Sequence, residues 1–244
     1  HLARFLNVTP EQIGWTSNTS LAIRHAFAQI DWRPRDVLIS TDAEHVGTRA
    51  AYDGLTARYG VRRAIVPANE GDDAFLSAFA ATLEREPGAR LVFLSHVSCQ
   101  DGRRLPVREA ARLAHAAGVP VAVDAAQSVG QFPVDLADLD CDLCLASGHK
   151  WLLSPPGLAY VIAKDVRAFK SDFLLPAAID ASSDLPMGRR LEIGIEGWAT
   201  RAGLDVGLTL LEAIGMAEIE RYVAGLSERL RAGLAAMPNC EWLT

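Results

Sequence analysis

Side chains that could take part in catalysis follow five successive apolar segments of this sequence. They are the hydroxyls of Thr16 to Ser20 (TSNTS), the pair Glu44 and His45, the pair His96 and Ser98, Asp124 with Gln127, and the group Ser147, His149 and Lys150. In an open α/β sheet, ligands bind beyond the carboxyl ends of the strands. We therefore expect these side chains to meet at one edge of a sheet and to form an active site there.

The TSNTS segment opens a predicted helix. Free backbone N–H groups and the helix dipole at such a position favour an anion such as phosphate. Thr19 and Ser20 are therefore candidates for binding phosphate. The alternative is ordinary capping of the helix by Asn18 or Thr19.

Asp124 and Lys150 each leave an apolar strand. The carboxylate of Asp124 is expected to be buried and to require a cation or a hydrogen-bond donor, which a protonated ring nitrogen would supply. Capping of the next turn is the alternative for this residue. Lys150 lies between a small-residue turn (SGH) and an apolar run (WLL), so its amine could be freed as a nucleophile that forms a Schiff base. The alternative is a surface lysine.

The cysteines include one C-x-x-C pair, Cys141 and Cys144, a spacing that invites a zinc or redox interpretation. Residues three apart on a strand point to opposite faces, so we predict core packing for this pair and no metal site. The chain has 4 cysteines, too few for a disulfide scaffold, and no signal peptide precedes them. These features predict a cytoplasmic location.

The composition limits the classes of partner. The 244 residues are 50% hydrophobic and 22% charged, as in globular proteins. With 24 basic and 30 acidic residues the net charge is −6, and no basic run occurs, so we expect neither nucleic acid nor a membrane surface as partner. The apolar runs are shorter than the ~20 residues of a membrane helix. A small molecule is the expected partner.

Apolar periodicity predicts an α/β fold in which strands alternate with amphipathic helices. Because the strands are almost continuously apolar, we expect a mostly parallel sheet buried on both faces. The predicted strands are 36–40, 61–66, 90–95, 119–124, 142–146 and 158–163. The predicted helices are 19–30, 44–59, 72–85, 107–117, 198–214 and 217–237, and residues 169–190 are expected to be irregular. We expect a large domain over residues 1–215 and the beginning of a smaller domain over residues 216–244.

Two segments, VAVDAAQSVGQFPVDL and CDLCLASGHKWLLSPPGLAYV, resemble the signature of the class V aminotransferase family of pyridoxal-phosphate (PLP) enzymes. This family includes cysteine desulfurases, selenocysteine lyases and isopenicillin N epimerase, and the resemblance extends from about Ile13 to Gly215. It implies the large domain of the fold-type I PLP-dependent transferases, a mostly parallel mixed sheet between helices, with the second small domain largely absent from this chain. It also implies a homodimer whose active site lies near the subunit interface.

The resemblance assigns a role to eight of the candidate residues. Lys150 would form the internal aldimine with PLP, Asp124 would keep the pyridine nitrogen protonated, and His45 would stack on the ring. The remaining cofactor contacts would come from Gln127 to the phenolic oxygen, and from Thr19, Ser20, Ser147 and His149 at the phosphate end.

The chain departs from the family pattern at two places. Cys99 occupies a position where many members have an asparagine near the cofactor. Gly194-Ile195-Glu196-Gly197 replaces a segment whose threonine reaches the phosphate of the partner subunit in many members. The family's substrate-carboxylate arginine and the catalytic cysteine of the desulfurases are expected beyond Thr244, and Cys240 is not a candidate for that cysteine.

We therefore predict a PLP-dependent lyase or transferase that acts on an amino acid through a Schiff base on Lys150, of cysteine desulfurase or C–S lyase type. An epimerase like isopenicillin N epimerase, or an aminotransferase of the same family, is the first alternative, because carbanion formation is common to these reactions. A non-catalytic scaffold that retains the fold is the second.

Overall fold

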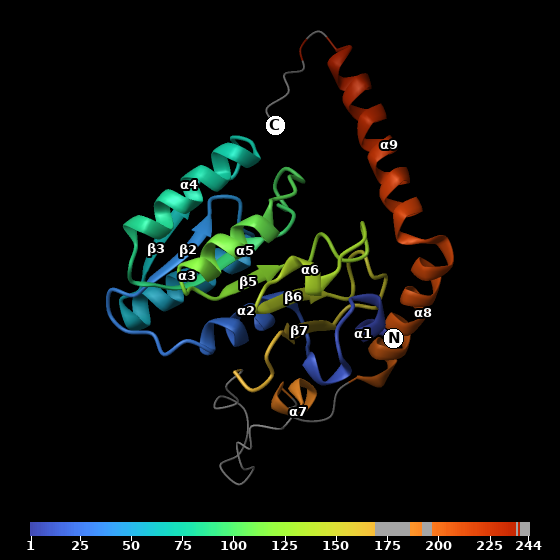
Figure 1. Ribbon diagram of the computed structural model, residues 1–244. Coiled ribbons are helices and arrows are strands. Elements are labelled where there is room, and N and C mark those ends of the chain that lie inside the picture. Colours follow the sequence, from blue (N-terminus) through green and yellow to red (C-terminus); the bar gives the residue numbers. More distant parts are fainter. Residues whose placement is uncertain (169–185, 192–196, 238, 240–244) are drawn as a thin grey trace.

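A seven-stranded mixed sheet forms the centre of the structure, a computed structural model that describes residues 1–168, 186–191, 197–237 and 239 (Figure 1). The strand order is β1-β7-β6-β5-β4-β2-β3. The pairs β1–β7 and β6–β7 are antiparallel and the other pairs are parallel. The strands are β1 (Ile13–Thr16), β2 (Val37–Thr41), β3 (Arg62–Val66), β4 (Ala89–Ser95), β5 (Val121–Asp124), β6 (Leu143–Ser147) and β7 (Ala159–Ala163). The predicted α/β class and the mostly parallel sheet are confirmed.

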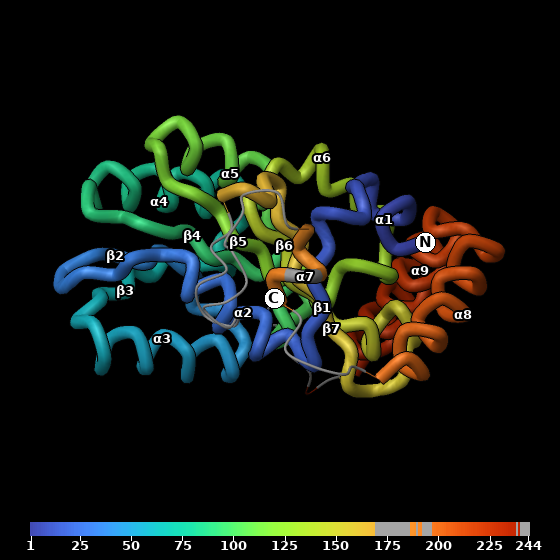
Figure 2. Tube along the Cα trace, turned by 90° about the horizontal axis from the view of Figure 1, so that it is seen from below, coloured from blue at the N-terminus to red at the C-terminus, as the bar shows by residue number. Residues whose placement is uncertain are grey.

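Helices cover both faces of the sheet (Figure 2). The helices of one face pack on a core cluster that contains Ile23, Tyr52 and Phe93, and those of the other face pack on a cluster that contains Phe75, Ala110 and Leu208. The first face carries α2 (Thr19–Ala28), α3 (Val46–Tyr59) and α7 (Met187–Leu191). The second face carries α1 (Leu2–Phe5), α4 (Asp72–Arg85), α5 (Val107–Ala116), α6 (Leu136–Leu139) and part of α8 (Trp198–Ile214).

The apolar runs of the sequence form strands that lie buried between two layers of helices. Every residue of β2, β5 and β7 is buried, as expected for strands with helices on both sides. The edge strand β3 is mostly exposed or half-buried: Arg62 is exposed, and Arg63 is half-buried with its guanidinium over the Tyr52 ring. The predicted strands therefore coincide with the observed ones to within about two residues, the disagreement usual at element ends.

Several elements differ from the sequence prediction, which did not include α6 or the short 3-10 helix at Pro10–Gln12. The run that begins at Ile13 forms an additional strand, β1, whose partner is β7. The prediction that residues 169–190 are irregular is wrong for Met187 to Arg190, which belong to α7. This helix packs closely on β1, because a Cβ atom at Gly14 would lie only 2.6 Å from Leu191 Cδ1. Residues 169–185 lie outside the part of the chain that the structure describes.

The last two helices, α8 and α9 (Met216–Ala235), are separated by Gly215, whose φ of +90° ends α8. Helix α8 packs beside α1, whereas α9 extends away from the sheet and buries none of its residues (Figures 1 and 2). The division into domains at residue 215 stays a prediction. Within the described ranges, no helix has both the length and the apolar character needed to cross a membrane.

The C-x-x-C pair is buried, which confirms the predicted core packing. The predicted geometry is wrong, however, because Cys141 and Cys144 belong to the same core cluster rather than to opposite faces. Cys141 precedes β6, which begins at Leu143, so strand alternation does not govern the spacing. A hydrogen bond between the two side chains, together with burial, raises the pKa of the Cys144 thiol well above its ordinary value.

Candidate active site

The N-terminus of α2 brings two hydroxyl groups together. The Asn18 side chain caps this helix by accepting a hydrogen bond of 2.9 Å from the Leu21 N–H. Thr19 is therefore not needed as the cap, and its hydroxyl is hydrogen-bonded to that of Ser147 at the end of β6. Two hydroxyls beside a helix N-terminus are an arrangement suited to an anion.

The loop between β2 and α3 places His45 next to α2. His45 caps α3, and its Nδ1 accepts a hydrogen bond of 3.0 Å from the Gly47 N–H. A Cβ atom at Gly47 would lie 2.9 Å from Ser20 Oγ and 3.1 Å from His45 Nδ1. Glycine at this position thus allows Ser20 and the His45 imidazole to approach each other.

Asp124 ends β5 and is buried, with 8% of its surface exposed. Burial raises the pKa of its carboxyl above the ordinary value. A hydrogen bond of 2.9 Å from the Ala126 N–H, and the charges of Lys150 and His45, act in the opposite direction. The structure therefore brings Lys150 and His45 within electrostatic reach of Asp124, and a further cationic donor would stabilise the charged form of this carboxyl.

The loop from β6 to β7 carries His149, which is exposed, and Lys150, which is half-buried. Two backbone hydrogen bonds fold this loop back on itself, one of 2.9 Å from the Ser154 N–H to the Gly148 carbonyl and one of 3.3 Å from the Leu153 N–H to the Lys150 carbonyl. These two hydrogen bonds hold the loop in a compact turn.

Two glycines on neighbouring elements allow those elements to approach the backbone of the Lys150 loop closely. At Gly130, in the loop after β5 and with φ of +95°, a Cβ atom would lie 2.6 Å from the Trp151 carbonyl oxygen. At Gly207 on α8, a Cβ atom would lie 2.2 Å from the Leu152 carbonyl oxygen. These long-range contacts have no signal in the local sequence, and sequence reasoning missed them.

Gln127 connects the loop that follows β5 to the Lys150 loop. Its Oε1 accepts a hydrogen bond of 2.9 Å from Trp151 Nε1. The side chain is half-buried. Because its oxygen is already used, Gln127 has its amide N–H groups to offer to a ligand.

His96 follows β4 at the predicted edge of the sheet, but the prediction that its side chain meets the others in one site is wrong. In the parallel pairing of β4 with β5, Ser95 lies beside Asp124, so the next side chain, His96, points to the opposite face. There its ring packs edge-on against Phe132, with centroids 5.4 Å apart. Burial, assisted by the charge of Arg104, lowers the pKa of His96 from 6.5 to about 4.

Glu44 is a buried acid beside the site; sequence analysis placed it at the predicted edge with His45 but assigned it no specific role. None of its surface is exposed. It accepts hydrogen bonds from Thr41 Oγ1 (2.8 Å), the Ser95 N–H (3.2 Å) and Ser95 Oγ (2.7 Å). Burial is the main cause that raises the pKa of this carboxyl, to about 7, with Asp124 adding to the effect and the three hydrogen bonds opposing it.

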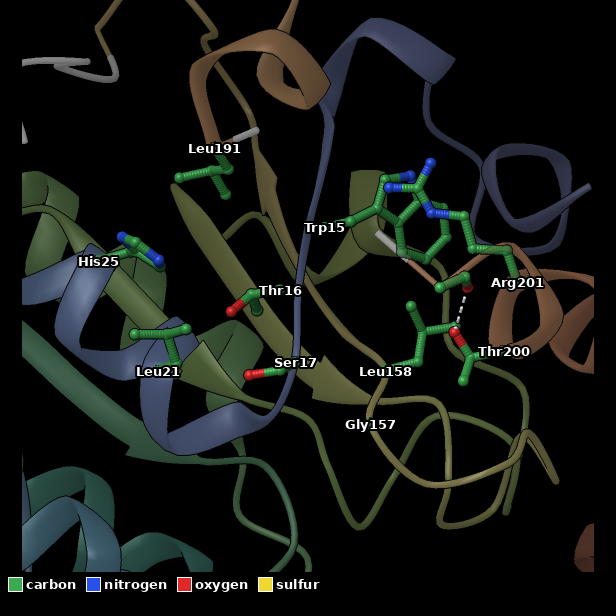
Figure 3. Close-up of a pocket in the computed structure, with 11 residues that line it drawn as sticks. Trp15, Thr16, Ser17, Leu21, His25, Gly157, Leu158, Leu191, Thr200 and Arg201 are labelled. Carbon is green, nitrogen blue, oxygen red and sulfur yellow. Dashed lines mark hydrogen bonds between the residues drawn. The ribbon is translucent and has the colours of Figure 1, made fainter. Parts of the chain in front are cut away.

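A cavity of about 240 Å³ lies beside the first turn of α2, between that helix, α7 and α8 (Figure 3). Thr16 and Ser17 contribute to its wall, and the Arg201 guanidinium lies over the Trp15 ring at 5.2 Å. Asp124, His45 and Lys150 are not among the described residues that line it. Nor do the described ranges contain a group of three or more His, Cys, Asp or Glu side chains able to hold a metal ion.

Comparisons with known proteins agree on one family. The model of the family described as aminotransferase class-V matches residues 1–244. The chain is 28% identical to a probable cysteine desulfurase of Synechocystis sp., over 98% of this chain and 59% of that protein. It is 30% identical to the isopenicillin N epimerase of Streptomyces clavuligerus, over 91% of this chain and 54% of that protein. The chain thus spans about 60% or less of the length of these relatives.

Solved structures give the same result. The apo structure of a cysteine desulfurase from Thermococcus onnurineus NA1 superposes with a TM-score of 0.85 and 27% identity, over 96% of this chain and 60% of that one. The cystine C–S lyase C-DES, in complex with its reaction product cysteine persulfide, superposes with a TM-score of 0.84 and 28% identity, over 97% and 66%. Another structure of C-DES holds glycine covalently linked to its PLP cofactor.

Proposed function

Because this chain belongs to the class V aminotransferase family, whose enzymes use PLP as cofactor, we propose that it forms the cofactor-binding part of an enzyme of cysteine desulfurase or C–S lyase type. The substrate would be an amino acid. Desulfurases and a cystine C–S lyase among the similar proteins support this choice. Because this chain spans only part of the length of these proteins, the activity of the whole enzyme is part of the proposal.

The donor set of the site fits PLP. This cofactor has an anionic phosphate, a ring nitrogen that can carry a proton and an aldehyde that reacts with an amine. Thr19 and Ser147 offer hydroxyls at the N-terminus of α2, and Ser20 and His149 lie on the same two segments. The observation that carries the proposal is the buried carboxyl of Asp124, within electrostatic reach of both Lys150 and His45.

Each side chain then has a physical task. PLP, when bound, withdraws electrons from a bond at the substrate Cα. Asp124 holds a proton at the ring nitrogen, because a buried carboxylate is stabilised by a cationic donor. His45 would cover one face of the ring, and the Gln127 amide would donate to its phenolic oxygen. The Lys150 amine would hold the cofactor aldehyde and, as a free amine, could move a proton as a general base.

The same fold supports other outcomes of the reaction. Epimerisation or transamination remains the first alternative, since the isopenicillin N epimerase of Streptomyces clavuligerus is among the relatives. Incubation of the PLP-loaded protein with L-cysteine distinguishes them. Sulfide or a persulfide is the expected product, and racemised or transaminated amino acid without any sulfur product would contradict the proposal.

A non-catalytic scaffold is the second alternative. We expect the protein reconstituted with PLP to show a visible absorption band that disappears on borohydride reduction and that shifts in Lys150→Ala. Asp124→Ala should retain the band yet lose turnover by orders of magnitude, because the ring nitrogen would lose its proton. A protein that stays colourless with PLP would favour the scaffold, and full turnover in Asp124→Ala would refute the role of Asp124.

We also propose that the protein works as a homodimer with the active site near the subunit interface. Several large apolar side chains of α8 and α9 are exposed, among them Trp198 (75%), Val206 (70%) and Tyr222 (66%). Large apolar side chains exposed along two consecutive helices are consistent with an interaction surface. Light scattering of the PLP-loaded protein should give twice the mass of one chain, and a monomer would contradict this proposal.

A further inference from the structure

Glu44 ties together two segments that the proposed cofactor site uses. Its carboxyl binds Thr41 at the end of β2 and Ser95 at the end of β4. The residue itself immediately precedes His45, the cap of α3. The carboxyl therefore lies inside the fold, while the next side chain along the chain faces the site.

The backbone of Glu44 is held as firmly as its side chain. Its carbonyl oxygen accepts a hydrogen bond of 3.2 Å from Arg49 Nε and a longer one of 3.4 Å from Gln100 Nε2. Arg49 belongs to α3 and Gln100 to the loop after β4. The Glu44 backbone is thus fixed between α3 and this loop, and the freedom of the adjoining His45 is reduced.

The anchor point of the carboxyl is adjacent to Asp124. Ser95 is the register partner of Asp124 in the parallel pairing of β4 with β5. Glu44 and Ser95, linked by two hydrogen bonds, therefore connect the segment that carries His45 to the strand that lies beside Asp124.

We propose that Glu44 is a positioning residue, whose buried carboxyl fixes His45 against the PLP ring by clamping the β2–α3 loop to β4 beside Asp124. This inference rests on the proposed function. The inference deepens that function, because it attributes the orientation of His45 to a residue that does not touch the cofactor.

The contacts explain why an acid suits this position. Three donors converge on two oxygens: the Thr41 hydroxyl, the Ser95 N–H and the Ser95 hydroxyl. Glutamine has nearly the same shape, but it offers one acceptor oxygen and two N–H donors. The Ser95 hydroxyl can turn to accept from one N–H, which leaves the other without a partner among these groups. The raised pKa of the carboxyl is in keeping with a group buried close to another acid, Asp124.

The test is a double-mutant cycle on the affinity for PLP, measured by absorbance in the full chain. Glu44→Gln should weaken PLP binding about tenfold, the effect of losing about one good buried hydrogen bond. In the His45→Ala background the same change should weaken binding by less than about twofold, because the residue that Glu44 positions is gone. A purely structural role would give the same factor in both backgrounds and would overturn the inference.

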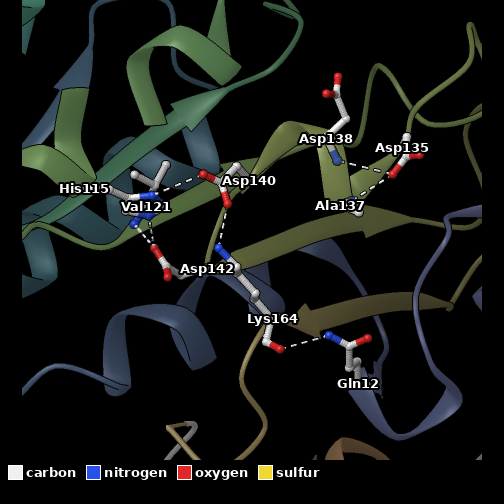
Figure 4. A network of polar contacts seen from close by, with 9 residues as sticks. All are labelled: Gln12, His115, Val121, Asp135, Ala137, Asp138, Asp140, Asp142 and Lys164. Atoms are coloured by element: carbon white, nitrogen blue, oxygen red, sulfur yellow. Dashed lines mark hydrogen bonds and ion pairs between the residues drawn. The ribbon is translucent and has the colours of Figure 1, made fainter. Parts of the chain in front are cut away.

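Two further variants complete the design. Thr41→Val removes one hydrogen-bond donor to Glu44 while it preserves the shape of the side chain, so it keeps the test valid if Glu44→Gln does not fold. We expect it to weaken PLP binding about threefold, and this effect should also disappear in the His45→Ala background. Asp142→Asn is the matched control, because its carboxyl accepts from Val121 N–H (2.7 Å) and contacts His115 at the opposite edge of the sheet (Figure 4). It should leave PLP binding unchanged.

The outcomes separate this inference from the proposed function. If the unaltered chain binds no PLP, the proposed function fails and the inference falls with it. If the unaltered chain binds PLP and both Glu44→Gln and Thr41→Val bind it equally well, only the inference is overturned.

Discussion

Replacing Glu44 with glutamine should change how the stability of the fold depends on pH. Burial raises the pKa of the Glu44 carboxyl from 4.5 to about 7. Between these values the folded chain holds a proton that the unfolded chain has released. The free energy of unfolding therefore falls as the pH rises through this window, by about 3 kcal/mol in total at about 1.4 kcal/mol per pKa unit.

His96 produces the opposite dependence. Its pKa is lowered from 6.5 to about 4, so in that window the unfolded chain holds the additional proton. The free energy of unfolding then rises with pH, again by about 3 kcal/mol. Burial also raises the pKa of Asp124, which adds to the effect of Glu44, and lowers that of His25, which adds to the effect of His96. In the unaltered chain these contributions oppose each other.

Urea unfolding of the variant and of the unaltered chain at several pH values isolates the contribution of Glu44, because groups common to both proteins cancel. The free energy of unfolding of Glu44→Gln, relative to the unaltered chain, should increase by about 3 kcal/mol from pH 4.5 to 7. His96→Gln is the matched control, and its relative free energy should decrease between pH 4 and 6.5. A difference for Glu44→Gln that does not change with pH would refute the reasoning.

The close approach of glycines to the Lys150 loop gives two further predictions. Gly130→Ala should lower the free energy of unfolding by about 2–5 kcal/mol, because it adds backbone strain and packs a Cβ atom against a carbonyl oxygen. Gly71 has a similar φ of +94° but open space around its Cβ position. Gly71→Ala should therefore lower the free energy of unfolding by the cost of strain alone, about 1–2 kcal/mol. Equal losses in urea unfolding would contradict the role of close approach. Gly207→Ala should destabilise by about 1–3 kcal/mol and weaken PLP binding, while Gly225→Ala, at an open position of α9, should stabilise by up to about 1 kcal/mol. Thermal unfolding of both variants checks the sign, and a Gly207→Ala protein as stable as the unaltered chain would show that α8 does not press on the loop.

The sheet was predictable from the sequence because its strands are apolar runs between polar loops. The same reasoning placed Asp124 and Lys150 at the carboxyl ends of neighbouring strands, and the structure brings them within electrostatic reach, although their roles stay predictions. The face to which His96 points was not predictable in the same way. A shift of one residue along a strand reverses the side on which a side chain lies, and only the pairing of β4 with β5 decides it.

The partners of Glu44 were beyond sequence reasoning for a related cause. Thr41 is three residues away, but Ser95 is 51 residues away, and their meeting depends on β2 lying beside β4 in the sheet order. The contact of Gly207 with the Lys150 loop is likewise long-range. From the sequence, a glycine within a helix indicates only a lower helix propensity. The structure shows which neighbouring backbone would clash with a side chain at that position.

Two parts of the fold position the residues of the site: the sheet, and the loop that carries Lys150. The sheet fixes Asp124 and, through Glu44, the segment that carries His45. The Lys150 loop, in contrast, leaves the sheet after Ser147, and its backbone at Trp151 and Leu152 lies close to Gly130 and to Gly207 of α8. We therefore expect a displacement of α8 to affect the Lys150 loop more than Asp124, which the sheet holds. Weaker PLP binding by Gly207→Ala, with the sheet intact, would support this division.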